Sequence, residues 1–389
     1  MFRVKVVLLQ LLFYTVTPNA APPAVSDISF RGHIPALDGI RGLAILLVMI
    51  SHFLIPELFR DNTHYRILQL GWLGVDLFFV LSGFLITGIL SDTSEKAGYW
   101  KGFIRRRVLR IFPLYYFSVL VVWLTVMFAE KAPDRLQGYD SFVWFFGFAP
   151  NIAMALKDNW LYHSHVFSLN HLWSVAIEEQ FYLLWPLIVY WLPRRALLIF
   201  CFTLVAFSTS IRLATDDYVG HEWSLAAYML PWCRMDGLAT GGFLAVLFRL
   251  GWQRYIPFSN WLMRIAVICA AILLVRQAMY GSEQTIATIS AVGFGALLYL
   301  ALNQHPQAFV RRVCEHAFLR HLGKYSYGLY VFHEMFKYAW MKGFGAWLLQ
   351  SGWPAWLAQI VFIGLAGLGS YVLARVSWKW VEEPFLRWK

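Results

Sequence analysis

Residues 37–53 read LDGIRGLAILLVMISHF, an apolar run that contains an aspartate, an arginine and a histidine. A helix needs about 20 mostly apolar residues to cross the roughly 30 Å hydrocarbon core of a bilayer. Extended by a few residues to 36–55, this run has the required length, and further runs of the same kind follow it. The stretch therefore predicts a transmembrane helix that carries ionisable groups.

The composition of the whole chain points the same way. Of its 389 residues, 59% are hydrophobic and 14% are charged, whereas soluble domains are about 45–50% apolar and about 25% charged. The net charge is +11, but Lys and Arg stand in short clusters between apolar runs, so we attribute them to membrane orientation and expect no nucleic-acid partner. The four cysteines show no CxxC spacing, and no metal site is expected.

About ten apolar runs are long enough to cross a membrane. They cover residues 36–55, 70–90, 111–129, 173–192, 196–213, 226–248, 261–280, 284–303, 325–344 and 355–375. Lys and Arg gather in alternate connections between these runs, as the positive-inside rule requires. We therefore predict an all-α integral membrane protein with about ten transmembrane helices and both termini in the cytoplasm. Residues 141–156 are apolar but short, which favours a re-entrant or interfacial element.

The two ends of the chain are expected to lie outside the transmembrane domain. At the start of the N-terminal segment 1–33, Arg3 and Lys5, a following apolar stretch and small residues near Ala20 resemble a secretory signal peptide. Cleavage would place the new terminus outside the cell, against the charge pattern, so we favour an uncleaved interfacial segment. The transmembrane domain is assigned to residues 34–385, and residues 386–389 form a cytoplasmic tail end.

The first predicted helix places two ionisable residues on one face. Arg41 and His52 are eleven residues apart, which leaves them within roughly 20° around the helix and about 16 Å apart along it. A charged side chain at the centre of a span costs at least about 2.5–3.5 kcal/mol, so such residues are candidates for function. For this pair alone, an interfacial arginine and a hydrogen-bonded core histidine explain the pattern equally well.

Further charges cluster in two places. Residues 103–113 include Arg107 and Arg110 just before a predicted span, and guanidinium groups bind phosphate bidentately, although an anchor contacting anionic lipid is the favoured explanation of this block alone. Glu178 and Glu179 point about 100° apart on a helix, so at most one faces a given partner squarely. A glutamate beside His52 would orient its ring for general-base catalysis, and a packing salt bridge is the alternative.

The remaining charged motifs are weaker. Asp76 can be explained by pairing with a basic neighbour, and structural pairing is also favoured for Arg234 and Asp236. His333, which ends the run YSYGLYVFH, is equally compatible with a structural and a catalytic role.

Taken in order, these segments resemble the acyltransferase 3 family of membrane-bound O-acyltransferases, bacterial proteins that typically acylate sugar hydroxyls on surface glycans. The resemblance runs from about Ile34 to Phe385. It rests on the Arg-x10-His pattern of 37–53, GVDLFFVLSGFLI at 74–86, the Arg-x-x-Arg of the basic block, and HLWSVAIEEQFYLLWP at 171–186. The chain departs from many relatives in having Glu383 before the tail proline, and it ends before the SGNH hydrolase-like domain that many of them carry.

The resemblance implies an acyl-CoA donor substrate, usually acetyl-CoA, that enters from the cytoplasm, with no tightly bound cofactor. It implies a carbohydrate acceptor, either a surface glycan or a lipid-linked sugar, and a multi-pass protein in lipid contact in the bacterial cytoplasmic (inner) membrane. Its site residues are the catalytic His52 and the donor-binding Arg41, Arg107 and Arg110. We combine these with the charge analysis into a hypothesis in which His52, oriented by Glu178 or Glu179, deprotonates the acceptor hydroxyl.

Three alternatives stay open. The acceptor could be a small secreted molecule such as a macrolide, which keeps the chemistry and changes the substrate. A transporter or flippase of an acyl donor or glycolipid would also place charged groups inside the membrane, although no inverted repeat is visible. Finally, Ser51 or Ser82 could form an acyl-enzyme, but neither has a strong local motif.

Overall fold

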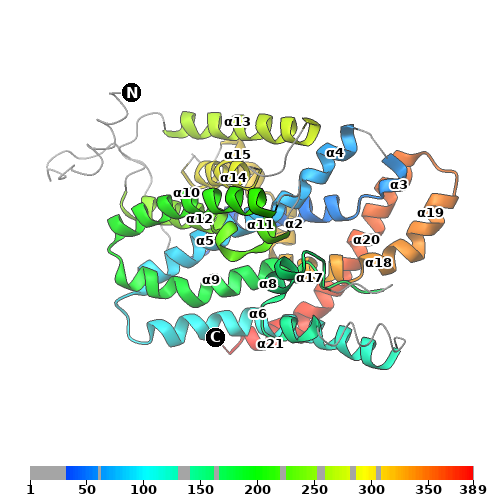
Figure 1. Ribbon diagram of the computed structural model, residues 1–389, viewed down its shortest axis with the longest axis horizontal. Coiled ribbons are helices and arrows are strands. Elements are labelled where there is room, and N and C mark those ends of the chain that lie inside the picture. Colours follow the sequence, from blue (N-terminus) through cyan, green and yellow to red (C-terminus); the bar gives the residue numbers. More distant parts are fainter. Residues whose placement is uncertain are drawn as a thin grey trace.

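The structure, a computed structural model, describes residues 32–59, 63–129, 141–161, 166–219, 225–251, 259–280, 286–303 and 308–388. The described residues are helical and contain no extended strand. Many of the longer helices run roughly along one direction, with α13 (Ser259–Tyr280) at one edge and α6 (Tyr99–Ala129) at the opposite edge (Figure 1). The expected N-terminal segment 1–33 lies almost entirely outside the described residues.

The first two strong motifs form neighbouring helices at the centre. The Arg-x10-His motif lies in α2 (Pro35–His52), and GVDLFFVLSGFLI opens α5 (Gly74–Thr93). Helix α5 packs closely on α12 (Met235–Arg249). A Cβ atom at Gly83 would lie 1.9 Å from the carbonyl oxygen of Leu238, so the motif needs glycine there to let the two backbones approach.

The other helices complete a bundle around this centre. They are α9 (Leu172–Trp191), α10 (Arg194–Val219), α14 (Ile286–Asn303), α16 (Ala317–Lys324), α17 (Ser326–Met335) and α20 (Ala355–Ser377). Short helices connect them: α3 (Pro56–Phe59), α4 (Thr63–Gln69), α8 (Pro150–Lys157), α11 (Leu225–Met229), α15 (Phe309–Cys314), α18 (Lys337–Trp340), α19 (Ala346–Gln350) and α21 (Glu383–Leu386).

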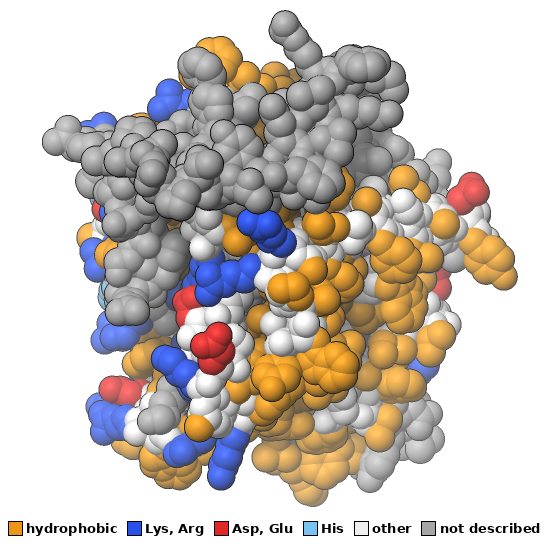
Figure 2. Space-filling view, turned by 90° about the vertical axis from the view of Figure 1, so that its left-hand side faces the viewer, with side chains coloured by type: hydrophobic (Ala, Val, Ile, Leu, Met, Phe, Trp, Pro, Cys, Tyr) orange, Lys and Arg blue, Asp and Glu red, His pale blue; other side chains and the backbone are white. Residues whose placement is uncertain are grey.

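The surface of these helices is suited to lipid. On α9, Leu183 and Trp191 are 68% and 78% exposed, and α20 presents Ile360 and Leu368 in the same way. Figure 2 shows hydrophobic side chains covering a broad area beside a region of basic ones. Large exposed apolar surfaces mark contact with a membrane or a protein partner, and helices long and apolar enough to span a bilayer favour the membrane. The all-α membrane class is therefore confirmed in its coarse form.

Five helical segments of the described residues are long and apolar enough to cross a membrane. These are Pro35–His52, Tyr65–Thr93, Tyr99–Phe128, Arg194–Thr215 and Ala355–Leu386. Two shorter apolar segments, Met263–Ile272 and Ile286–Leu302, lie where further spans were expected. The total of ten spans and the cytoplasmic termini therefore stay predictions.

Three expected element boundaries were wrong. The expected span 111–129 begins earlier, because the basic block 101–110 belongs to the same helix, α6. The expected span 226–248 is broken by Pro231, which opens a short 3-10 turn, Pro231–Cys233, before α12. The expected span 325–344 is interrupted after Met335, whose carbonyl accepts a hydrogen bond from the backbone N–H of Ser168 at 3.1 Å.

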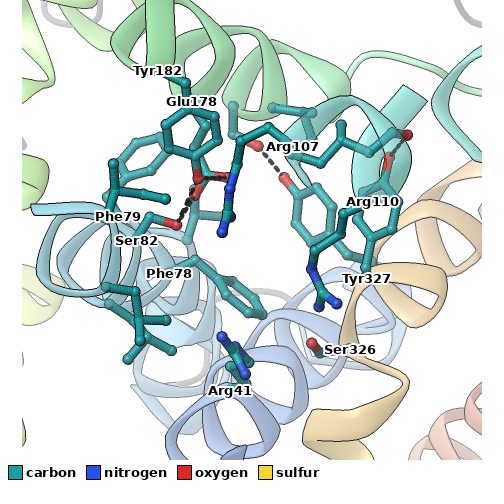
Figure 3. Close-up of a pocket in the computed structure, with 18 residues that line it drawn as sticks. Arg41, Phe78, Phe79, Ser82, Arg107, Arg110, Glu178, Tyr182, Ser326 and Tyr327 are labelled. Carbon is teal, nitrogen blue, oxygen red and sulfur yellow. Dashed lines mark hydrogen bonds between the residues drawn. The ribbon is translucent and has the colours of Figure 1, made fainter. Parts of the chain in front are cut away.

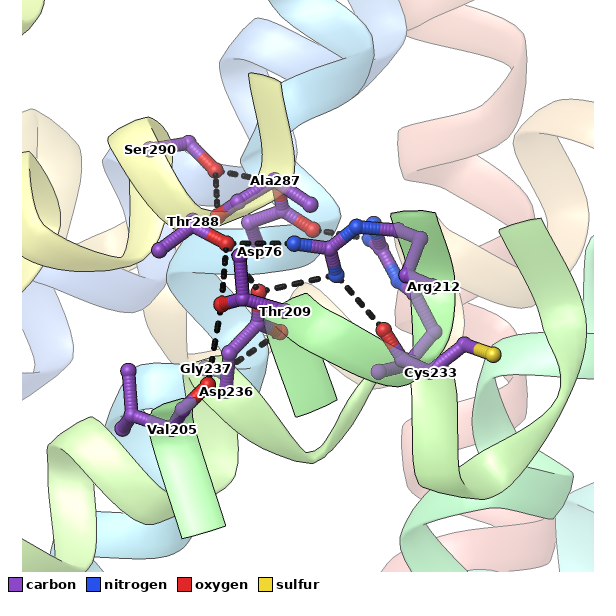
Figure 4. Close-up of polar contacts among 11 residues, drawn as sticks. Asp76, Val205, Thr209, Arg212, Cys233, Asp236, Gly237, Ala287, Thr288 and Ser290 are labelled. Carbon is purple, nitrogen blue, oxygen red and sulfur yellow. Dashed lines mark hydrogen bonds and ion pairs between the residues drawn. The ribbon is translucent and has the colours of Figure 1, made fainter. Parts of the chain in front are cut away.

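Buried charges inside this bundle are paired, as the sequence predicted for Asp76, Arg234 and Asp236. Asp76 on α5 forms an ion pair with Arg234, and Asp236 on α12 lies 2.9 Å from a guanidinium nitrogen of Arg212 on α10. Thr288 on α14 donates a hydrogen bond to Asp236 at 3.1 Å (Figure 4). Two arginines and two aspartates thus neutralise each other and join four helices.

Candidate active site

A cavity of about 120 Å³ lies among α2, α5, α6, α9 and α17. Its charged lining residues are Arg41 on α2, Arg107 and Arg110 on α6, and Glu178 on α9. The three guanidinium groups come from different directions and point toward the same space (Figure 3). The structure therefore brings together four of the six site residues predicted from sequence, with cations in excess.

The carboxylate of Glu178 is held on one wall of this cavity. Its two oxygens accept hydrogen bonds from Ser82 Oγ at 2.7 Å and from Tyr182 Oη at 3.1 Å. The guanidinium of Arg107 lies 5.6 Å from the centre of the Tyr182 ring, within cation–π range. Arg107 Nε is buried and has no hydrogen-bond partner among the described residues, so this guanidinium retains capacity for a ligand.

The two adjacent glutamates differ as the helix geometry predicted. Glu178 lines the cavity, whereas Glu179 does not belong to its lining. Glu179 Oε1 is buried without a hydrogen-bond partner in the described part of the chain.

His52 lies in a second cluster, outside the lining of the cavity. Its Nδ1 is 2.9 Å from Nε2 of His333 and 3.3 Å from a carboxylate oxygen of Glu334, both on α17. The expected orientation of His52 by Glu178 or Glu179 was therefore wrong, because Glu178 is bonded to Ser82 and Tyr182 and α17 supplies the partners of His52.

The hydrogen bonds of His333 fix the protonation pattern of the cluster. Its Nδ1 lies 3.1 Å from the carbonyl oxygen of Leu329, and because a carbonyl can only accept, this nitrogen must carry the proton. In the neutral ring Nε2 is then an acceptor, so His52 donates to it from Nδ1. The neutral His52 ring is left with an unprotonated Nε2, which is the form that a general base requires.

The same cluster has the residue types of a metal site. Ligand atoms of His52, His333 and Glu334 all lie within 4.8 Å of one another. We assign the 2.9 Å contact between the two imidazoles to a hydrogen bond, because the backbone bond of His333 accounts for its direction.

Tyr330 forms a wall between the cavity and the histidine cluster. It lines the cavity, and its ring centre lies 5.5 Å from that of His333. Its hydroxyl is 2.6 Å from Ser174 Oγ and donates to the carbonyl of His171 at 3.1 Å. His171 itself is buried, and both of its ring nitrogens are without partners among the described residues.

Comparison with known proteins identifies the family. Residues 34–375 match the acyltransferase domain of the acyltransferase 3 type. The chain belongs to this acyltransferase family. No solved structure matches it significantly.

Three relatives indicate what members of the family do. The peptidoglycan O-acetyltransferase OatA of Listeria monocytogenes is 29% identical over 78% of this chain and 49% of its own length. The putative peptidoglycan O-acetyltransferase YrhL of Bacillus subtilis is 28% identical over 77% of the chain and 48% of its own length. The O-acetyltransferase OatA of Staphylococcus aureus is 27% identical over 90% of this chain and 57% of its own length. The chain thus spans about half the length of these curated relatives.

Two members of the site could not be found by strong sequence signals. For His333, the sequence favoured neither a structural nor a catalytic role. Glu334 was not singled out, although it follows His333 directly. Glu334 lies inside a run that was expected to span the membrane. An ionisable residue at such a position is itself a signal for function.

Proposed function

We propose that this chain is an O-acyltransferase that moves an acyl group, in the first place acetyl, from cytoplasmic acyl-CoA to a hydroxyl of a cell-wall or lipid-linked glycan. The family supports the reaction class, and the names of the relatives support the acetyl group and the glycan acceptor. The observation that carries the chemistry is the hydrogen bond of His52 Nδ1 to His333, which leaves Nε2 of the partly exposed ring without a hydrogen bond in the described part of the chain.

In the proposed reaction His52 Nε2 takes the proton of the acceptor hydroxyl as its oxygen attacks the thioester carbon. The carbon–oxygen bond forms, the carbon–sulfur bond breaks, and the proton passes to the departing CoA sulfur. The imidazolium that forms is stabilised by the Glu334 carboxylate, 3.3 Å from Nδ1. Proton transfer by a positioned base contributes about 10²–10⁴-fold to a rate.

The donor is assigned to the cavity of Arg41, Arg107, Arg110 and Glu178. Arg107 has an unused buried Nε and lies inside the cavity, so it is suited to the negative charge that develops on the thioester oxygen. Because Tyr330 stands between this cavity and His333, transfer requires its side chain to move or the acyl group to pass beside it. Phe78, which contacts the Tyr330 ring edge-on, forms the adjoining wall.

The deciding experiment uses the purified chain in lipid nanodiscs, with acetyl-CoA labelled in the acetyl group and extracted envelope glycans. Label should enter glycan with the wild type and be lost with His52→Ala. His316→Ala, at an exposed histidine that does not line the cavity, serves as the matched histidine control.

Each other outcome identifies a different protein. Release of CoA without labelled glycan would point to another acceptor, such as a small secreted molecule. Donor movement across the bilayer without cleavage of the thioester would establish a transporter. Acetyl label retained on wild-type protein after denaturation, and lost with Ser82→Ala, would replace direct transfer by an acyl-enzyme.

A further inference from the structure

A second, larger cavity adjoins the donor cavity. This basic bowl has a volume of about 550 Å³ and is lined chiefly by Asp38, Arg41, Arg110, Arg320, Lys324 and Trp378. Arg41 and Arg110 also line the 120 Å³ cavity, so the two spaces meet at these arginines. The lining comes from α2, α6, α16 and the π-helical segment η5 (Trp378–Glu382).

The charges of the basic bowl are not balanced. Its one carboxylate, Asp38, already contacts Arg41 at 2.8 Å and His33. Within the described ranges, Arg110, Arg320 and Lys324 form no ion pair, and the Lys324 ammonium lies 5.5 Å from the centre of the Trp378 ring. The end of the molecule in Figure 2 shows more basic than acidic side chains. Uncompensated cations in a concave site attract an anion.

The sizes of the two cavities decide which part of a donor each can hold. Ligand sites are typically about 300–1,000 Å³, so the 550 Å³ bowl has room for a nucleotide with its phosphates and the 120 Å³ cavity does not. The smaller cavity is therefore assigned to the acyl-thioester end of the donor. The arginines at the junction would lie between the two parts.

We propose that the basic bowl binds the phosphorylated nucleotide of the acyl donor, with Arg320 and Lys324 on its phosphates. This inference rests on the proposed function and revises it, because the phosphates then lie outside the cavity that contains Arg107. Arg107 is left to the thioester, while Arg41 and Arg110 hold the junction. Arg320 and Lys324 become specificity residues for a nucleotide-bearing donor.

The test separates the nucleotide from the arm. Adenosine 3′,5′-bisphosphate, which has the nucleotide phosphates and no thiol arm, is titrated onto full-length protein in phosphatidylcholine nanodiscs by equilibrium binding. Arg320→Ala and Lys324→Ala should each weaken its binding about tenfold, as expected for loss of one charge-assisted hydrogen bond. Arg312→Ala removes an exposed arginine from the adjacent α15, outside the bowl, and should change binding less than twofold.

Turnover of labelled acetyl-CoA is measured on the same preparations. Arg320→Ala and Lys324→Ala should raise the KM for acetyl-CoA about tenfold with little change in kcat. They should leave the KM for acetyl-pantetheine, which lacks the nucleotide, unchanged. If both variants keep the wild-type KM for acetyl-CoA, the bowl assignment is overturned while the transferase stands. If the nucleotide binds as predicted but neither the wild type nor any variant turns over the donor, the bowl stands and the transferase fails.

An anionic lipid headgroup offers the same phosphate chemistry and is the rival occupant. Nanodiscs containing phosphatidylglycerol distinguish the two sources. Nucleotide that binds with the same variant pattern in both membranes supports the donor assignment. If phosphatidylglycerol abolishes nucleotide binding, and if Arg320→Ala protein no longer binds this lipid, the bowl is a lipid site.

Discussion

The molecule buries arginines in two regions, and the two regions treat them in opposite ways. Between α5, α10, α12 and α14, Arg212 and Arg234 each face an aspartate, and neither arginine is more than 4% exposed. Around the donor cavity, Arg41, Arg107 and Arg110 face one another across open space with a single lining glutamate. Equal charges without a cavity indicate a structural cross-link, and excess charge around a cavity indicates a ligand.

Free energies support this distinction. Removing one partner from a buried ion pair costs about 3–5 kcal/mol because the other charge stays buried and unpaired. Around the donor cavity three cations face one carboxylate, and Glu178 keeps its hydrogen bonds to Ser82 and Tyr182 when one cation is removed. Substitutions in the paired network should therefore act on stability, and substitutions in the donor cavity or the His52 cluster should act on activity alone.

The largest expected effect is on activity and follows from His52→Ala. We expect kcat to fall by about 10²–10⁴-fold, because the proposed base is lost. Thermal unfolding in detergent should change little, since the side chain is 26% exposed. Activity is measured as acetyl transfer from labelled acetyl-CoA, at matched protein abundance in the membrane. Near-full activity of this variant would remove His52 from the mechanism.

The next largest effect is on stability and follows from Arg234→Met. Asp76 would be left buried and unpaired, so we expect a loss of about 3–5 kcal/mol and a sharp drop in folded protein. The double variant Arg234→Met/Asp76→Leu removes both charges and should recover most of the loss. Thermal unfolding and size-exclusion chromatography report both results. A stable single variant would show that the network is not the cross-link described above.

The sequence predicted the donor cavity better than the His52 cluster, for a physical reason. The grouping of Arg41, Arg107 and Arg110 followed from the family resemblance, because helical periodicity shows only which residues of one helix share a face. The partners of His52 could not be predicted, since His333 lies 281 residues further along the chain and periodicity carries no information on which helices meet. The break after Met335 could not be predicted for the same reason, since its carbonyl accepts a hydrogen bond from the backbone N–H of Ser168, in a distant connection.

A smaller effect should separate Arg107 from Arg234. Arg107→Ala removes one of three cations around the cavity and a proposed partner of the thioester oxygen, so we expect kcat to fall roughly 10–100-fold, the value of one charge-assisted hydrogen bond. Its unfolding temperature should stay close to that of the wild type, because the relief of repulsion from Arg41 and Arg110 offsets the lost attraction to Glu178. Arg107→Lys keeps the charge and should restore part of the rate. An unfolding temperature lowered as far as that of Arg234→Met would show that Arg107 is structural.

The smallest expected effect tests whether Glu334 acts through His52. Glu334→Gln keeps the shape of the side chain and removes the charge beside His52 Nδ1, so the imidazolium formed during transfer loses its counter-ion. We expect kcat to fall about tenfold, equivalent to about 1.4 kcal/mol, with the KM for acetyl-CoA unchanged because Glu334 does not line the donor cavity.

Lys337→Met is the matched control for this last substitution. Lys337, the first residue of α18, lies 3.6 Å from Glu334 and competes with His52 for its charge. Its removal leaves the carboxylate to His52 alone, so kcat should hold or rise while Glu334→Gln lowers it. Equal losses in both variants would mean that the cluster is held together as a structural unit, like the network around Arg234. If the two substitutions change kcat in opposite directions, the charge of Glu334 acts in the reaction. In a purely structural pair, removal of either partner would lower kcat.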